Sequence, residues 1–290
     1  MKAITDSVIA QAHTPQYKMH KYFARRPYNV FSNLISFYTK PNEIVYDCFC
    51  GGGVTIFEAL KLNRKAIGVD LNPLATMITK TQIFTKDYNK LKLALNDFSK
   101  KINDYYKKYY IYNGIEDSGD IIWTEWVYLV KCPLCGSIIE LSENNKIKNG
   151  VYACTNSNCQ NSSGLERLST IPFGIKPIRV KYVSKTGVEK VVKVNTQEEV
   201  LSYSDELESI KKSTTYDCAL PLDDMDRQRE DRLKERGVQN YSDLFTVRNF
   251  AVTCLIFDDI LKLKSKYENW IVDYIYLTFS SRISSNIKHV

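Results

Sequence analysis

The residues from Ile44 to Pro73 constrain the fold of this chain more than any other stretch. Four kinds of segment follow one another there: an apolar run ending on an acid, a glycine run, a helix-like run, and a second apolar run ending on an acid. They are Ile44–Tyr46 with Asp47, Gly51–Gly53, Thr55–Leu62, and Ala66–Val69 with Asp70. This order of strand, glycine turn, helix and strand predicts the nucleotide-binding half of a doubly wound α/β fold.

Each part of this pattern has a physical role in ligand binding. Glycines adopt backbone conformations with positive φ and let a ligand approach the backbone without an intervening Cβ atom. An acid at the end of the second strand, here Asp70, is placed to accept hydrogen bonds from ribose hydroxyls. Gly51 and Gly53 fit the fingerprint G-x-G-x-x-G, but Ile56 occupies its third glycine position. The pattern therefore favours a mononucleoside-like ligand over one that contains a pyrophosphate.

The string DCFCGGGVT, Asp47–Thr55, resembles the D-P-F-x-G-S-G-T-T motif of the S-adenosylmethionine-dependent amino-methyltransferases of DNA. The following Glu58–Ala75 is similar to the next helix, strand and acid of that family. Upstream, His20–Pro27 resembles the family segment that closes over the methionine end of the cofactor. Three positions depart from the motif, where Pro, Ser and Thr are replaced by Cys48, Gly52 and Val54. These changes are mild for binding, because the backbone supplies most of the contacts.

The resemblance implies both a fold and a function. Enzymes of this family methylate the exocyclic nitrogen of adenine (N6) or cytosine (N4) in DNA, including those of restriction–modification systems. It implies a Rossmann-like methyltransferase half-sheet in which Asp70 accepts from the ribose, Asp47 lies near the amino-acid end of S-adenosylmethionine, and Phe49 packs on the cofactor. The residues expected to bind the cofactor are Tyr22, Ala24, Arg25, Arg26, Pro27, Asp47, Phe49, Gly51, Gly53, Thr55, Asp70 and Asn72.

A second motif of this family, [D/N/S]-P-P-[Y/F/W], is absent from the sequence. In the family its acceptor groups hold the hydrogens of a weakly nucleophilic amine, and its aromatic residue stacks on a flipped base. The eight prolines stand at positions 15, 27, 41, 73, 133, 172, 177 and 221, and no two are adjacent. We therefore expect no catalytic residue here: the chain would be the N-terminal part of a longer or split enzyme, inactive without a C-terminal catalytic half.

Four of the eight cysteines have the spacing of metal ligands. Cys132 and Cys135 form a Cys-x₂-Cys turn followed by Gly136, and Cys154 and Cys159 form a second turn with four residues between them. Two such turns complete a tetrahedral thiolate site, so the spacing predicts a structural zinc ribbon in preference to four unrelated buried cysteines. This use of cysteine also indicates a reducing compartment.

Two strand-like runs, Ile178–Val183 and Val188–Val194, predict a β-hairpin after the ribbon. The hairpin is rich in Lys and Arg, with Glu189 as its single acid between positions 176 and 193. Such a surface can follow a DNA phosphate backbone, but a charge run is as often a solvated face. The residues expected to contact nucleic acid are Lys176, Arg179, Lys181 and Lys185.

Apolar residues recur at helical spacing in four of the remaining stretches, and a further helix is expected to start after the turn at Asn72–Pro73, which makes five predicted helices. They are Tyr28–Tyr38, Leu74–Thr79, Tyr88–Tyr110, Phe250–Leu263 and Trp270–Ile283. Residues 195–217 are polar and are expected to be partly loop. The charged run 223–237 is expected to form an exposed helix or a segment that orders on a polyanion.

Length and composition limit the number of domains and the class of protein. A chain of 290 residues can hold one domain with an insertion, and its apolar and charged fractions of 44% and 25% are those of an ordinary globular protein. The net charge of +7 is compatible with a polyanionic partner but is not diagnostic. With no run of membrane-spanning length, we expect a cytoplasmic protein. Four parts are predicted: a cofactor-binding part (1–86), a connecting amphipathic helix (87–118), a zinc-ribbon and hairpin insertion (119–220), and a charged segment with helices that return to the methyltransferase domain (221–290).

Two alternatives to a DNA amino-methyltransferase stay open. One is a non-catalytic remnant that touches DNA through its zinc ribbon and basic hairpin. The other is a methyltransferase that acts on RNA, since some RNA enzymes share both the glycine motif and D-P-P-Y. The incomplete glycine fingerprint argues against a dehydrogenase or a flavoprotein.

Overall fold

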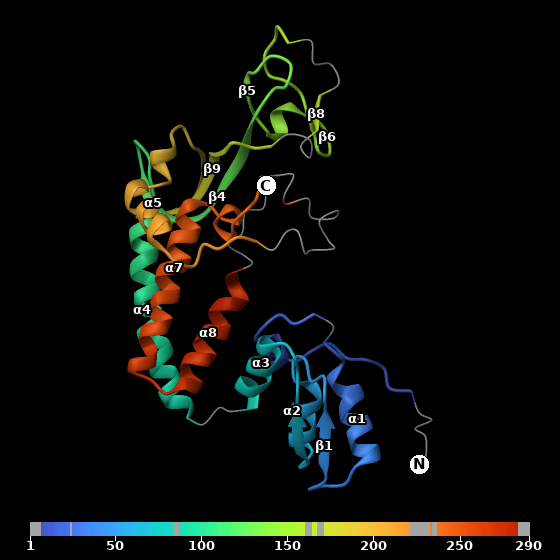
Figure 1. Cartoon of the computed structure of the whole chain (residues 1–290). Coiled ribbons are helices and arrows are strands. Elements are labelled where there is room, and N and C mark those ends of the chain that lie inside the picture. The colour runs from blue at the N-terminus through green and yellow to red at the C-terminus, as the bar shows by residue number, and fades with distance from the viewer. Residues whose placement is uncertain are drawn as a thin grey trace. The chain divides into compact units, whose positions relative to one another are not determined.

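The computed structural model describes residues 7–23, 25–83, 87–159, 164–166, 171–220, 233 and 237–283. They form a mixed α/β structure, and contacts group the chain into two compact units (Figure 1). Unit 1 contains residues 1–99 and 257–285, and unit 2 contains residues 100–256 and 286–290. Except for 233 and 237, the charged run 223–237 lies outside the described residues. None of the described helices is both long enough and apolar enough to cross a lipid bilayer.

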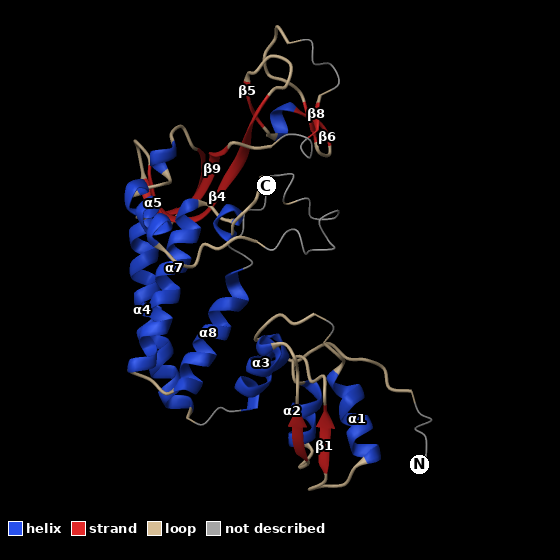
Figure 2. Ribbon diagram, in the orientation of Figure 1, coloured by secondary structure: helices blue, strands red, loops and turns tan. Residues whose placement is uncertain are grey.

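Two parallel strands and the helix between them form the centre of unit 1 (Figure 2). β1 (Ile44–Asp47) pairs with β2 (Lys65–Gly68), and α2 (Val54–Lys61) connects them. The chain passes from β1 into α2 through Gly51 and Gly53, whose φ angles of 49° and 77° lie in the left-handed region that favours glycine. The predicted order of strand, glycine turn, helix and strand is confirmed.

Unit 1 has three further helices: α1 (Tyr28–Tyr38), α3 (Pro73–Ile83) and α8 (Asn269–Ile283). α1 and α3 pack against α2, and α3 also packs against α8. Pro73 opens α3, since proline lacks the N–H group that the first turn of a helix leaves unpaired. All three helices were predicted and are confirmed, and α3 begins at Pro73, one residue before the start expected after the Asn72–Pro73 turn.

A buried hydrogen bond ties the N-terminal segment to α2. The Tyr17 hydroxyl, on the 3₁₀ turn η1 (Pro15–Lys18), donates to Glu58 Oε1 at 2.5 Å, and both side chains are buried. Lys61 Nζ donates to the same carboxylate oxygen at 3.0 Å, so the buried charge of Glu58 is compensated. Burial, reinforced by the bond to Glu58, raises the pKa of Tyr17. The phenol therefore stays protonated and holds the segment that precedes α1.

α2 covers one face of the β1–β2 pair, and the other, here called the bare face, is exposed in the described part of the chain. On the covered face, Ile56 of α2 lies against Gly68. Side chains alternate between the faces of a strand, so Ile44 and Tyr46 share the opposite face, where Ile67 is the register partner of Tyr46. Ile44, Tyr46 and Ile67 are 59%, 63% and 50% exposed, so nothing among the described residues covers them. Parallel sheets are normally covered on both faces.

Unit 2 contains a curled antiparallel sheet of five strands among its described residues. Its strands follow the order β10 (Glu189–Lys193), β9 (Gly174–Ser184), β4 (Ser118–Lys131) and β3 (Ile111–Asn113), and β5 (Ile138–Glu140) also pairs with β4. Two irregularities interrupt the register between β4 and β9, and such bulges bend a sheet. The predicted hairpin is confirmed as β9 and β10, whereas β3 and β4 were not predicted.

A smaller sheet carries the region of the cysteine turns. Its antiparallel strands are β6 (Lys146–Lys148), β7 (Val151–Tyr152) and β8 (Leu165–Glu166). β6 and β7 form a hairpin between the two cysteine turns, and the chain turns through Gly150 at a φ of 77°. One buried cluster joins this sheet to β4 and β5: Val130, Cys132, Ile139, Leu141, Tyr152 and Leu165.

Three helices of unit 2 share a buried cluster that includes Tyr109, Leu207 and Ala251. They are α4 (Tyr88–Tyr109), α5 (Ser204–Ser213) and α7 (Val247–Lys262), and both α4 and α7 contribute residues to both units. The helices α4 and α7 are confirmed, whereas α5 lies in a stretch expected to be partly loop. Short 3₁₀ turns complete the described elements: η2 (Glu143–Asn145), η4 (Gln197–Glu199), η6 (Tyr241–Leu244) and η7 (Leu263–Ser265).

A buried arginine fixes α7 within unit 2. The guanidinium of Arg248 lies 4.4 Å from the centroid of the Tyr110 ring, and its Nη1 donates to Val200 O at 2.5 Å. Burial lowers the pKa of Arg248. The ring and the carbonyl supply the electrostatic compensation that a buried cation needs.

We predict that Gly119→Ala destabilises unit 2. A Cβ atom at Gly119 of β4 would lie 2.0 Å from the Val183 carbonyl oxygen of β9, which is backbone and cannot yield without opening the sheet. The expected loss is about 3 kcal/mol in the free energy of unfolding. Urea denaturation followed by the fluorescence of Trp123 and Trp126, in a Trp270→Phe background, measures it.

The matched control is Gly174→Ala in β9. A Cβ atom there would meet only Leu129 Cδ1, at an ordinary contact distance of 3.7 Å, so the unfolding midpoint should stay close to that of the parent. Equal midpoints for the Gly119 and Gly174 variants would contradict this account of the β4–β9 pairing.

Candidate functional site

A pocket of about 350 Å³ opens in unit 1 at the carboxyl ends of β1 and β2. The segment before α1, the glycine turn and the tips of both strands form its wall. The residues that line it are Tyr22, Phe23, Arg25, Arg26, Phe31, Asp47, Phe49, Cys50, Gly51, Gly52, Val54, Thr55 and Asp70. Ligands of open α/β sheets bind outside the carboxyl ends of the strands, which is where this pocket lies.

Eight of the residues predicted to bind a cofactor line this pocket: Tyr22, Arg25, Arg26, Asp47, Phe49, Gly51, Thr55 and Asp70. Three others lie outside its lining. Pro27 precedes the first residue of α1, Gly53 packs against Thr79, and Asn72 Oδ1 accepts from the Leu74 N–H of α3 at 3.0 Å. Ala24 lies outside the described residues.

Five lining residues were not predicted: Phe23, Phe31, Cys50, Gly52 and Val54. Four of them fall inside the two motifs, so their position in the sequence was a sufficient signal. Phe31 lies on α1, and only the packing of that helix brings it to the pocket.

Two carboxylates at the strand tips fix the glycine turn. Asp70 accepts from the Gly51 N–H at 2.8 Å on one oxygen and from the Asn72 N–H at 2.9 Å on the other. Asp47 Oδ1 accepts from the Phe49 N–H at 3.0 Å. A carboxylate offers about four acceptor sites, so both acids can still accept hydrogen bonds from the hydroxyl or amino groups of a ligand.

Aromatic side chains border the glycine turn. A Cβ atom at Gly51 would lie 3.0 Å from Tyr22 Cε1 and would press on this ring, and the φ of 49° at Gly51 also favours glycine. Tyr22 stacks on Phe23, with ring centroids 5.3 Å apart. Burial and the nearby charge of Asp70 raise the pKa of Tyr22, so its hydroxyl remains protonated. Phe23 and Phe49 are 82% and 84% exposed and are available to pack on a ligand.

Arg25 brings a positive charge to the pocket. Its guanidinium carbon lies 5.9 Å from the centroid of the Tyr17 ring, and Nη2 donates to His20 O at 3.4 Å. Its Nε atom is buried and has no hydrogen-bond partner among the described residues. Burial lowers the pKa of Arg25, but an arginine stays protonated at physiological pH.

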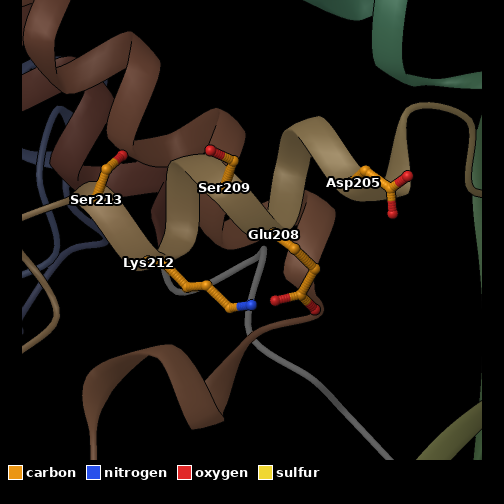
Figure 3. A pocket seen from close by; sticks show the side chains of 5 residues that line it. All are labelled: Asp205, Glu208, Ser209, Lys212 and Ser213. Atoms are coloured by element: carbon orange, nitrogen blue, oxygen red, sulfur yellow. The ribbon is translucent and has the colours of Figure 1, made fainter.

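A second depression lies on α5 in unit 2. It is lined by Asp205, Glu208, Ser209, Lys212 and Ser213, and Figure 3 shows these side chains projecting from one helix. Because a single polar helix supplies the whole lining, we interpret this depression as a solvated helix surface.

The four cysteines predicted to bind zinc meet in unit 2. Their Sγ atoms all lie within 4.8 Å of one another, and the pairs Cys132–Cys159 and Cys135–Cys154 are 3.8 Å and 3.6 Å apart. Thiolates on a tetrahedral zinc ion, with bonds of about 2.3 Å, are about 3.8 Å apart. Disulfide sulfur atoms are only about 2.05 Å apart. The geometry therefore suits a closed four-thiolate metal site.

Hydrogen-bond donors favour the thiolate, the form that binds metal, at two of the four cysteines, whereas burial and the neighbouring sulfurs of Cys135 and Cys132 raise the pKa of Cys154. The backbone N–H groups of Cys135 and Leu134 lower the pKa of Cys132. The Ser137 hydroxyl, 3.3 Å from Cys135 Sγ, and the Ser137 N–H lower the pKa of Cys135 to about 6. Gly136 makes the necessary turn at a φ of 72°.

The residues predicted to contact nucleic acid lie on β9 and the turn after it, and three of them are in ion pairs. The pairs are Lys176–Glu140 at 2.5 Å, Arg179–Glu125 at 2.5 Å and Lys181–Glu189 at 2.6 Å. The local sequence did not reveal Glu125 and Glu140, because strand pairing brings them from β4 and β5. Lys185, in the turn between β9 and β10, is exposed. Exposed ion pairs contribute only about 0–1 kcal/mol each, so a phosphate can compete for these cations.

We predict that the purified chain contains one zinc ion and that Cys132→Ser loses it. Removing one of four thiolates opens the site, and the folding of such a region is coupled to metal binding. Elemental analysis measures the zinc content. Cys218→Ser removes an exposed cysteine outside the cluster and should leave it unchanged. A wild-type chain that binds no zinc would exclude this site.

Comparison with known proteins addresses the first part of the chain. Residues 4–81 match a DNA methylase family model. The chain is similar to the type II methyltransferase M.MjaII of Methanocaldococcus jannaschii, with 28% identity over 87 residues, or 30% of this chain and 14% of that protein. It is also similar to the type II methyltransferase M1.MboII of Moraxella bovis, with 40% identity over 47 residues, or 16% of this chain and 18% of that protein. No solved structure matches the chain significantly.

The family match and the pocket coincide. Every lining residue, from Tyr22 to Asp70, falls within residues 4–81. The chain spans less than a fifth of the length of either curated relative. The N-terminal part of this chain, residues 4–81, therefore belongs to the DNA methylase family.

Proposed function

We propose that this chain supplies the cofactor-binding part of an S-adenosylmethionine-dependent methyltransferase that modifies an exocyclic amine of a DNA base, adenine N6 or cytosine N4. The observation that carries the proposal is the pocket at the glycine turn, where the residues of the family match surround two strand-tip carboxylates. The similarity to two type II methyltransferases supports the same reaction class.

The pocket residues fit S-adenosylmethionine in size and chemistry. The volume of about 350 Å³ lies in the range of small-molecule sites. We assign Asp70 to the ribose hydroxyls, Asp47 to the ammonium group of the amino-acid end, and Phe49 to packing on the cofactor. When bound, S-adenosylmethionine supplies a methyl group activated by a positively charged sulfur. The pocket then holds and orients this group for attack by an amine, which is a major source of rate.

We propose that a catalytic half carrying the D-P-P-Y motif packs on the bare face of β1 and β2. The exposed Ile44, Tyr46 and Ile67 support this, because parallel strands are normally covered on both faces. The catalytic half would supply the acceptors that hold the target amine and the aromatic residue that stacks on the flipped base. It can belong to the same polypeptide or to a separate chain.

We propose that unit 2 contains a structural zinc ribbon inserted in a Rossmann-like methyltransferase domain. The four-thiolate geometry supports zinc, and four protein ligands leave no open position for catalysis. In this division residues 1–86 bind the cofactor, 87–118 connect, 119–220 form the ribbon and hairpin, and 221–290 return to the methyltransferase domain.

We propose that the ribbon and the basic hairpin contact the DNA backbone through Lys176, Arg179, Lys181 and Lys185. Lys185 is exposed and can contact a phosphate directly. Lys176, Arg179 and Lys181 would exchange their carboxylate partners for phosphates. Such contacts position a protein on a duplex without reading its sequence.

Asp70→Ala is predicted to weaken the binding of S-adenosylhomocysteine by about 10-fold or more, because the ribose hydroxyls lose their acceptor. Asp70→Asn keeps one acceptor oxygen and should show an intermediate loss. Calorimetry measures both, and circular dichroism checks the turn that Asp70 holds. Asp104→Ala removes an exposed carboxylate of α4 outside the pocket and serves as the control. Unchanged affinity in Asp70→Ala would contradict the assignment.

The chain alone is predicted to transfer no methyl group. Labelled S-adenosylmethionine, the purified chain and duplex DNA should give no incorporation, because the acceptor and stacking residues for the base are absent. Adding a chain that carries D-P-P-Y and covers the bare face should restore transfer. Robust methylation by the isolated chain would show that the site is complete, and methylation of structured RNA in place of DNA would favour the RNA alternative.

A further inference from the structure

An exposed tryptophan lies on the outer face of the curled sheet in unit 2. Trp123 of β4 is 41% exposed, whereas the opposite face of the same strands carries the buried Ile121 and Tyr182. The indole makes no ring contact and no side-chain hydrogen bond with any other described residue. Aromatic side chains usually contribute their large surface to a core or an interface, so an exposed one marks a candidate contact surface.

A bulge in β4 turns this tryptophan out of the core. Ile121 pairs with Tyr182 and Trp123 pairs with Lys181, so Ile122 is an extra residue in β4. Residues two apart on a regular strand share a face, and without the bulge Trp123 would point into the core together with Ile121. Bulges that re-aim one side chain are common beside functional sites.

Strand pairing places a cation and a second apolar side chain beside the indole. Trp123 is the register partner of Lys181 on β9, and Lys181 is the register partner of Val191 on β10. Register partners point to the same face of a sheet, so these three side chains form one row across three strands, here called the tryptophan row. Val191 is 54% exposed, which extends the apolar surface of the row.

The next row on this face is basic. Lys181 pairs with Glu189 at 2.6 Å, and Arg179 pairs with Glu125 at 2.5 Å, so both acids are neutralised by a neighbouring cation. Lys193, the register partner of Arg179, is exposed and has no ion pair within the described part of the chain. One free cation therefore lies directly beside the tryptophan row.

The row on the other side carries the opposite charge. Asp120 of β4, the register partner of Val183, is exposed there. The apolar surface of Trp123 thus lies between a cation at Lys193 and an acceptor at Asp120. This order suits a nucleotide, because its phosphate is an anion and its base carries hydrogen-bond donors.

We propose that the tryptophan row binds an unpaired base of a nucleic-acid strand, stacked on Trp123, with a neighbouring phosphate on Lys193. The proposal rests on the proposed function and deepens it, because it adds a base contact to the backbone contacts assigned to the hairpin. A base inside a duplex is covered by its neighbours, so the ligand is a single strand or an extruded nucleotide. Aromatic rings beside cations are the usual platform for such strands.

Fluorescence anisotropy on the full chain tests this with labelled probes of about 15 nucleotides. The probes are oligothymidylate, an abasic strand of equal length, a duplex and oligouridylate. The abasic strand keeps the phosphates but lacks the bases. The wild-type chain should prefer oligothymidylate to the abasic strand by about 5- to 150-fold, the contribution of one stacked base. The tighter of oligothymidylate and oligouridylate assigns the strand to DNA or to RNA.

Variants separate the base from the phosphate. Trp123→Ala should lower the affinity for oligothymidylate to that for the abasic strand and leave the abasic affinity within about 2-fold of wild type. Trp123→Phe keeps a ring and should keep most of the preference. Lys193→Gln removes a cation but no ring, and should weaken both strands equally. Ile147→Ala removes an exposed side chain of β6 outside this sheet and should change no affinity.

Intrinsic fluorescence gives a readout that leaves the row intact. In a Trp270→Phe chain, oligothymidylate should quench the exposed indole of Trp123, and the abasic strand should not. Circular dichroism and zinc content check that each variant keeps its fold.

The outcomes separate this inference from the proposed function. Equal wild-type affinities for oligothymidylate and the abasic strand, unchanged in Trp123→Ala, would overturn the stacking site and leave the backbone contacts standing. Binding of polyglutamate as tight as that of oligothymidylate would overturn it in favour of an acidic protein partner. If the chain binds S-adenosylhomocysteine but no nucleic acid, this inference and the hairpin assignment are both wrong, and the cofactor pocket stands.

Discussion

The pocket depends on one constraint: the glycine turn after β1 must be held against the residues that follow β2. The Gly51 N–H donates to the Asp70 carboxylate at 2.8 Å, and Thr79 Oγ1 donates to Gly51 O at 3.1 Å. Asp70 and Thr79 both follow β2 in the chain. The N–H group and the carbonyl oxygen of Gly51 are therefore both held by the segment after β2. Gly53 reinforces this, since a Cβ atom there would lie 2.6 Å from Thr79 Oγ1. The turn is therefore pre-organised, and a ligand meets a backbone that needs little ordering.

The two hydrogen bonds that hold Gly51 explain how a sheet of two strands can form a defined pocket while one of its faces stays exposed. The chemistry lies at the tips of β1 and β2, where acids, aromatic rings and Arg25 converge. The stability of the pair depends on its faces, and the face of Tyr46 and Ile67 stays open in the described residues. The proposed function accordingly assigns cofactor binding to the residues of this pocket and base recognition to elements that cover the open face.

The local sequence pattern was sufficient to predict the helices and strands of unit 1 but not those of much of unit 2. α1 begins and ends at its predicted residues, because helical periodicity is a short-range property. The two motifs likewise located most of the pocket. β4 escaped prediction because its register shifts near Trp123 and Trp126 interrupt the alternation by which a strand is recognised. The partners of Lys176 and Arg179 arise from tertiary packing, which a one-dimensional pattern does not contain.

A crystal structure of the chain with S-adenosylhomocysteine tests the central claim most directly, because that claim is a geometry. The account predicts the ligand in the pocket of unit 1, with its ribose hydroxyls on Asp70, its amino group toward Asp47 and the ring of Phe49 packed on it. The glycine turn should keep the conformation it has without ligand. A ligand bound elsewhere, or one seated with its adenine against Arg25 and its amino-acid end at Asp70, would contradict the account.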